Sequence, residues 1–123
     1  MNNTCDILND SKSLAKELML GGKKWEIPML CARQNRVVDP LILGLLPLFA
    51  TWQQDKTTAL GMLSQPQYEA LQEIAFQGIS RGRPDVSRDA FLDLPVTLPE
   101  LVTAFAVVAE QTAIFSRGDP GEA

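Results

Sequence analysis

Residues 38–54, VDPLILGLLPLFATWQQ, are the stretch that decides how this chain folds. From Pro40 to Trp52 no side chain carries a charge, and the hydroxyl of Thr51 is the one strong hydrogen-bonding group. The segment could cross a membrane, form the buried centre of a domain, or contact another chain. A membrane-spanning helix needs about 20 apolar residues, whereas this run has 13 and is interrupted by Pro47. We therefore expect no membrane span and keep the other two interpretations.

The pattern within this segment predicts a helix that is apolar on most sides. Asp39 is a suitable N-cap, and Pro40 fits the first helical position, where its missing N–H costs nothing. The faces of this helix are Leu41, Leu45, Leu48 and Trp52; then Ile42, Leu46 and Phe49; and a narrow strip of Gly44, Pro47 and Thr51. A domain of 123 residues rarely needs a helix buried on every side. Part of this surface is therefore expected to contact another chain.

The preceding stretch, ELMLGGKKWEIPML at residues 17–30, predicts a β-hairpin. Apolar and other side chains alternate on both sides of Gly21-Gly22, a pair that tolerates the positive φ of a tight turn. The expected apolar face consists of Leu18, Leu20, Trp25 and Ile27. Because an isolated hairpin is marginal in water, this face must pack on the helices.

Three capping signals predict the helices that follow. Ser64 and Gln67 form one capping box, Ser87 can cap a short helix, and Thr97 with Glu100 forms a second box. After the second box, apolar residues at helical spacing predict a core face: Leu98, Leu101, Phe105 and Val108. Val107 and Ile114, seven residues apart, are expected on the otherwise polar side of that last helix.

The sequence thus predicts a mainly α fold: a single domain of about four to five helices with a short N-terminal β-hairpin. Residues 1–13, rich in Asn, Asp and Ser, are expected to be a flexible leader. The domain is expected to cover residues 14–116, with a flexible tail at 117–123. No internal repeat or interdomain linker interrupts it.

Composition argues against several classes of function. The net charge is −4 and the pI about 4.7, a balance unsuited to nucleic-acid backbones. There is no histidine, hence no imidazole nucleophile pair or metal ligand. Cys5 and Cys31 are expected to be free thiols, which favours a reducing cytoplasm. We expect no enzyme activity, no catalytic residue, no metal and no cofactor.

Two motifs together resemble a known family. The hairpin ELMLGGKKWEIPML is followed by helices, and LPVTLPELVTAFAVVAEQTAIF comes near the end at residues 94–115. This order of elements is similar to that of the tail assembly chaperones of long-tailed bacteriophages and prophages. The resemblance covers roughly residues 17–115, through a glycine–lysine, aromatic, Ile-Pro hairpin and a Thr-x-x-Glu-Leu helix.

The resemblance implies a non-enzymatic protein of the host cytoplasm that is absent from the mature virion. Such chaperones coat the tape measure protein before the tail tube polymerises, and the tail tube protein is a further candidate partner. Two alternatives stay open: a small regulatory or inhibitor domain that binds one folded partner, and a minor structural phage component. The resemblance favours the chaperone, and the number of copies that bind one long helical partner would separate the three.

The expected partner-binding residues are apolar side chains outside the predicted core faces: Ile42, Leu46, Phe49, Val107 and Ile114. A chaperone that coats a long helical chain must offer apolar grooves and must pack beside its own copies. We therefore expect a homo-oligomer, or a protein that oligomerises on its partner.

Overall fold

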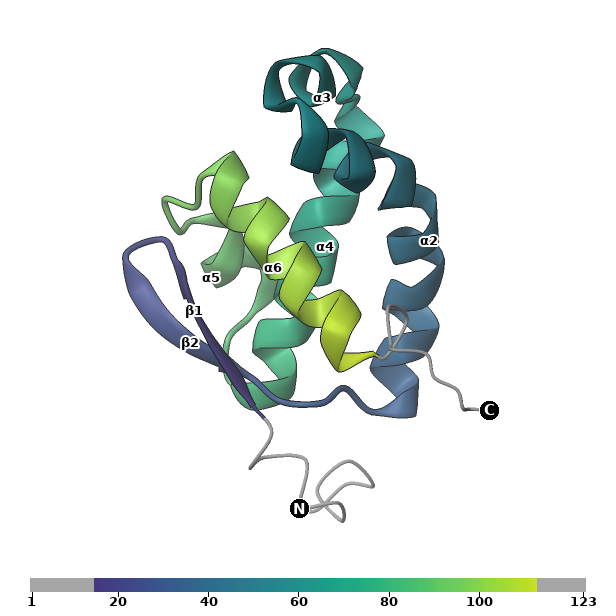
Figure 1. The fold of residues 1–123 in the computed structure, drawn as a ribbon. Coiled ribbons are helices and arrows are strands. Elements are labelled where there is room, and N and C mark those ends of the chain that lie inside the picture. The colour runs from purple at the N-terminus through teal and green to yellow at the C-terminus, as the bar shows by residue number, and fades with distance from the viewer. Residues whose placement is uncertain (1–14, 113–123) are drawn as a thin grey trace.

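The computed structural model describes residues 15–112, in which a two-stranded hairpin is followed by five helices (Figure 1). The elements are β1 (Lys16–Leu20), β2 (Lys23–Ile27), α2 (Ala32–Gln54), α3 (Lys56–Met62), α4 (Gln65–Gly82), α5 (Arg88–Leu92) and α6 (Leu98–Gln111). The hairpin lies on one side of the helices and α2 on the opposite side (Figure 1). The mainly helical fold with an N-terminal hairpin is confirmed. The predicted leader and tail lie outside the described residues.

The hairpin forms as the alternation predicts. Gly21 and Gly22 have φ values of 61° and 82°, which a glycine pair adopts without steric cost. The strands are antiparallel, with Leu18 opposite Trp25. All four predicted apolar side chains of the hairpin are buried. The indole Nε1 of Trp25 donates a 3.0 Å hydrogen bond to the carbonyl of Leu20, so this side chain also closes the turn.

The core joins the hairpin face to the inner faces of α2, α4 and α6. Its largest fully buried side chains are Phe105, Leu20, Ile27, Ile42, Ile74, Ile79, Leu101, Val38 and Val108. At the crossing of α4 and α6, a Cβ added to Gly78 would lie 2.8 Å from Cγ2 of Val108 and 3.1 Å from Cδ1 of Ile27. Glycine therefore lets the two helices and β2 approach closely at this point.

The start of α2 differs from the prediction. The helix begins after Cys31 and runs through both Pro40 and Pro47 to Gln54, so Asp39 is an interior residue and not an N-cap. Its Oδ1 is buried without a hydrogen-bond partner. Each interior proline removes one helical hydrogen bond, but both prolines lie on the exposed side, where water can satisfy the freed carbonyls. The buried residues continue at helical spacing across both prolines: Val38, Ile42, Leu45 and Leu48.

The three capping signals are confirmed. Ser64 and Thr97 each form a complete capping box at the start of α4 and α6, and Ser87 caps α5. The sequence reasoning missed α3, whose N-cap is Asp55: its carboxylate accepts hydrogen bonds from the backbone N–H groups of Thr57 and Thr58. Aspartate is a preferred N-cap residue, but Asp55 lies in a polar stretch where this preference alone does not mark a helix start.

The prediction of a free thiol is wrong at Cys31, which is in a disulfide, while Cys5 lies outside the described residues. The sequence context of a cysteine shows its neighbours along the chain but not its distance from a second thiol. The inference from free thiols to a reducing compartment therefore loses its basis. Separately, no helix within residues 15–112 is long and apolar enough to cross a membrane.

Candidate functional site

The two motifs that define the resemblance meet at one carboxylate. Oε1 of Glu100, the last residue of the Thr97 capping box, accepts a 3.0 Å hydrogen bond from the backbone N–H of Thr97. It also accepts a 3.2 Å bond from the backbone N–H of Gly21 in the hairpin turn. These two bonds lower the pKa of Glu100 below its ordinary value, Thr97 contributing most. One side chain thus starts α6 and ties the hairpin to it.

The hairpin turn rests on the loop that leads into α6. A Cβ added to Gly21 would lie 3.0 Å from Cβ of Leu94 and 3.4 Å from Pro95 and Val96. At the opposite end of the hairpin, the side chain of Gln111 donates a 2.7 Å hydrogen bond to the carbonyl of Ile27. The hairpin is therefore attached to both ends of α6, which makes the two motifs one structural unit.

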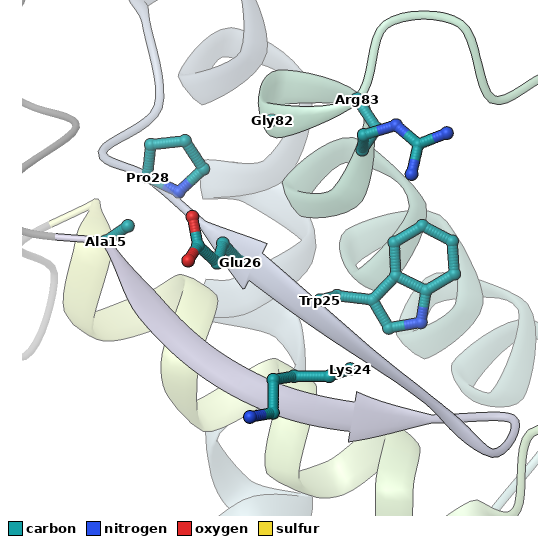
Figure 2. Close-up of a pocket in the computed structure, with 7 residues that line it drawn as sticks. All are labelled: Ala15, Lys24, Trp25, Glu26, Pro28, Gly82 and Arg83. Atoms are coloured by element: carbon teal, nitrogen blue, oxygen red, sulfur yellow. The ribbon is translucent and has the colours of Figure 1, made fainter.

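A cavity of about 380 Å³ opens beside the hairpin. It is lined by Ala15, Lys24, Trp25, Glu26, Pro28, Gly82 and Arg83. Figure 2 shows Arg83 beside the ring of Trp25, while the carboxylate of Glu26 lies toward Ala15 and Pro28. The guanidinium of Arg83 is held by Asp85 through bonds of 2.9 and 2.8 Å, and this contact lowers the pKa of Asp85. A bound ion would require charged groups that point toward one place. The charged groups of this cavity point in different directions.

Two further hollows among the described residues are wholly apolar and lie between α2, α3 and α6, over α4. One is lined by Leu45, Leu48, Phe49, Trp52, Leu71, Val102 and Phe105. Its neighbour is lined by Leu48, Trp52, Ala59, Leu60, Leu63, Leu71, Leu98 and Val102. Because they share Leu48, Trp52, Leu71 and Val102, the two hollows form one continuous surface, which we call the α2–α6 groove. Each hollow holds only about 10 Å³, too little for a small molecule.

The rim of the α2–α6 groove exposes a large apolar side chain. Leu60 of α3 is 50% exposed, and Met62 of the same helix is 43% exposed. The ammonium of Lys56 lies 5.7 Å from the centroid of the half-buried Trp52 ring, which places a cation at the edge of this surface. The groove is therefore a shallow crevice with a floor of buried apolar side chains and a partly polar rim.

The residues predicted to bind a partner occupy different environments. Ile42 is fully buried and belongs to the core, because α2 turns this side chain toward α4 and α6. Leu46, Phe49 and Val107 are half-buried and pack against the core. Ile114 lies outside the described residues. Partner binding through Leu46, Phe49 and Val107 stays a prediction.

Of these residues, Phe49 lines the groove, and its ring lies 4.9 Å from that of Phe105. Val107 does not form the separate exposed stripe that the helical wheel suggested, because α6 is enclosed on most sides and this residue packs on the core cluster. Sequence reasoning missed Leu60, Leu63 and Trp52 as groove residues. The presence of α3 would have indicated Leu60, since a short helix whose one buried residue is an alanine leaves its leucine near the surface.

Comparison of the chain with models of known families, with curated proteins and with solved structures finds no match. Among residues 15–112, no group of three or more His, Cys, Asp or Glu residues could hold a metal ion. We therefore argue function from the surfaces of the described residues, beginning with the α2–α6 groove, whose lining is wholly apolar.

Proposed function

We propose that this chain is a non-enzymatic tail assembly chaperone that binds a tape measure protein through the α2–α6 groove. The observation that carries the proposal is the groove itself, whose lining residues are all apolar and whose rim residue Leu60 is half exposed. A tape measure protein is a long helical chain with apolar stripes. These stripes must be shielded from water until the tail assembles. Such a stripe matches a shallow apolar groove.

The contact between the two resemblance motifs adds support. The glycine turn and the Thr-x-x-Glu helix start are far apart in the sequence, yet Glu100 joins them through Gly21. Two motifs that are in contact are a more specific pattern than either alone, and here the N–H of Gly21 in one motif binds Glu100 of the other. The resemblance to the chaperones thus rests on a unit of structure.

The size of the groove indicates how such a chaperone would act. Hollows of about 10 Å³ offer a shallow contact, so the affinity of one copy for a helix should be low. Many copies along one long chain would make the coating stable. In this proposal the chaperone acts in the host cytoplasm and leaves before the virion is complete.

The number of copies per partner tests the proposal. The chain is co-expressed with a full-length tape measure protein of the same genome, and the purified complex is weighed by native mass spectrometry. Several copies per tape measure chain are expected. A one-to-one complex would favour the inhibitor alternative, and retention of the chain in purified phage particles would favour a structural role. No complex at all would contradict the proposal.

A further inference from the structure

The outer side of α2 is an uncharged apolar surface that no described element covers. Figure 1 shows α2 at the edge of the molecule, and among residues 15–112 it packs against α3, α4 and α6 on its inner side. We call the outer residues the outer stripe: Val37, Pro40, Leu43, Gly44, Pro47 and Ala50. All six are exposed, with Leu43 at 56% and Val37 at 38%. This surface is distinct from the α2–α6 groove, whose α2 residues point inward.

The outer stripe is complementary to itself when two copies of α2 run in opposite directions. The midpoint between Leu43 and Gly44 is also the midpoint between Pro40 and Pro47 and between Val37 and Ala50. An antiparallel pair centred there sets Leu43 against Gly44 of the second copy, and Val37 against its Ala50. A large side chain therefore meets a small one at two of the three levels, and proline meets proline at the third, an arrangement that permits close helix packing. A Cβ added to Gly44 would meet nothing within 4 Å in its own chain, so this space is open to a partner.

The charges at the ends of the stripe select the same direction. Arg33 and Arg36 are exposed at the start of α2, and no hydrogen bond or ion pair with another described residue engages them. Asp55 is exposed just beyond the end of the helix. Antiparallel packing brings Arg33 beside Gln54 and Asp55 of the second copy, whereas parallel packing would bring the arginines together. The helix dipoles are also opposed only in the antiparallel pair.

We infer that the outer stripe of α2 binds a second copy of this chain, with the two α2 helices antiparallel and crossing at Leu43 and Gly44. The inference does not depend on the proposed function, because the complementarity is between copies of one surface. A helix of 23 residues is about 34 Å long. One such helix pair buries less than the roughly 800 Å² per partner of a standard interface, so the dimer should dissociate on dilution.

Sedimentation over a concentration series measures the dimer directly, with no tape measure protein present. The wild type should change from monomer to dimer as its concentration rises. Leu43→Glu should weaken association at least tenfold, because a carboxylate would face the second copy's glycine without a partner. Gly44→Leu should do the same by filling the space that receives Leu43. Leu92→Glu is the matched control, since Leu92 of α5 is 49% exposed and lies on another helix. Circular dichroism confirms that each variant keeps its helices.

Disulfide cross-linking determines the direction of the pair. Val37→Cys and Ala50→Cys chains are oxidised separately and as a mixture, against the unmodified chain as background. A cross-linked dimer is expected in the mixture alone, because in the antiparallel pair two copies of residue 37 are about 20 Å apart along the axis. Efficient cross-linking of Val37→Cys with itself would show a parallel pair and overturn the inference. A wild type that stays monomeric at every concentration would also overturn it, and would leave the stripe to a helical partner or to residues 113–123 of the same chain.

Discussion

At the residue scale, the most informative side chain is Glu100, because it serves the hairpin and α6 at once. Its folded-state pKa lies below the ordinary value of 4.5, so the ionised form stabilises the fold above that pH. This contribution is lost as the pH falls through the lowered pKa. A hydrogen bond to a charged group contributes about 1.5–3 kcal/mol, and a helix cap contributes about 1 kcal/mol.

Glu100→Gln should therefore lower the free energy of unfolding by about 1 kcal/mol at neutral pH. The difference from wild type should begin to shrink below about pH 4.5, where Glu100 of the unfolded chain becomes protonated, and should be lost once the pH passes below the lowered pKa of the folded state. Urea unfolding at several pH values measures both effects. Glu110→Gln on the same helix is the control, because Glu110 makes only an exposed ion pair with Lys16. A difference that stays constant down to pH 2 would show that the charge of Glu100 is not what matters.

Gly78 tests how closely the core elements approach. Gly78→Ala should destabilise the protein by about 1–3 kcal/mol, because the new methyl group would overlap Val108 and press on Ile27. Gly61→Ala, also within a helix, should raise stability by up to about 1 kcal/mol, since its Cβ meets nothing within 4 Å. Thermal unfolding compares the two variants. Equal changes in stability at both positions would mean that helix propensity alone determines the two effects. In that case α4 and α6 would not pack as closely at Gly78 as described.

At the scale of elements, α2 is the helix on which the fold depends. Leu45 is 2% exposed, and Leu45→Ala should cost about 2–5 kcal/mol of unfolding free energy. Leu46 is half-buried, so Leu46→Ala should cost only about 1 kcal/mol. Denaturant midpoints of both variants measure the difference. If Leu46→Ala proved the more damaging change, the orientation of α2 in the core would be wrong.

The elements that sequence reasoning found are those with local signals. The Gly21-Gly22 turn and the capping residues Ser64 and Thr97 fix their elements within a few residues, so the sequence is sufficient there. The start of α2 depends on tertiary packing, because burial of Val38 and Ile42 continues the helix past Pro40. Propensity places proline at a helix start, and no local rule shows that an exposed proline can be tolerated inside.

At the scale of the whole molecule, the sequence predicted that the candidate site is an apolar surface involving α2, but not which residues form it. The excess of apolar residues in residues 38–54 correctly indicated that α2 is buried on some sides and exposed on others. The positions of α3, α4 and α6 determine which side of α2 is buried and which is exposed. Ile42 consequently lies in the core, and the exposed strip is the one centred on Leu43 and Gly44. A helical wheel describes one helix and gives no information about its neighbours.

In the proposed function, the two apolar surfaces would have different roles. The α2–α6 groove lies on the side of α2 that faces α6, and the outer stripe lies on the opposite side of the same helix. A dimer formed through the outer stripe would leave both grooves open. Each pair could then hold two segments of a long partner, which raises the effective concentration of the second contact.

The central claim is that the α2–α6 groove binds an apolar helix, and the most direct test is one pair of variants. Leu60 at the groove rim and Leu92 on α5 are 50% and 49% exposed, so Leu60→Glu and Leu92→Glu introduce the same charge at equal exposure. The dissociation constant for a labelled amphipathic helix from a tape measure protein is measured by fluorescence anisotropy. Leu60→Glu should weaken binding at least tenfold, about 1.4 kcal/mol, and Leu92→Glu should leave it unchanged. Equal binding by both variants and the wild type would contradict the claim.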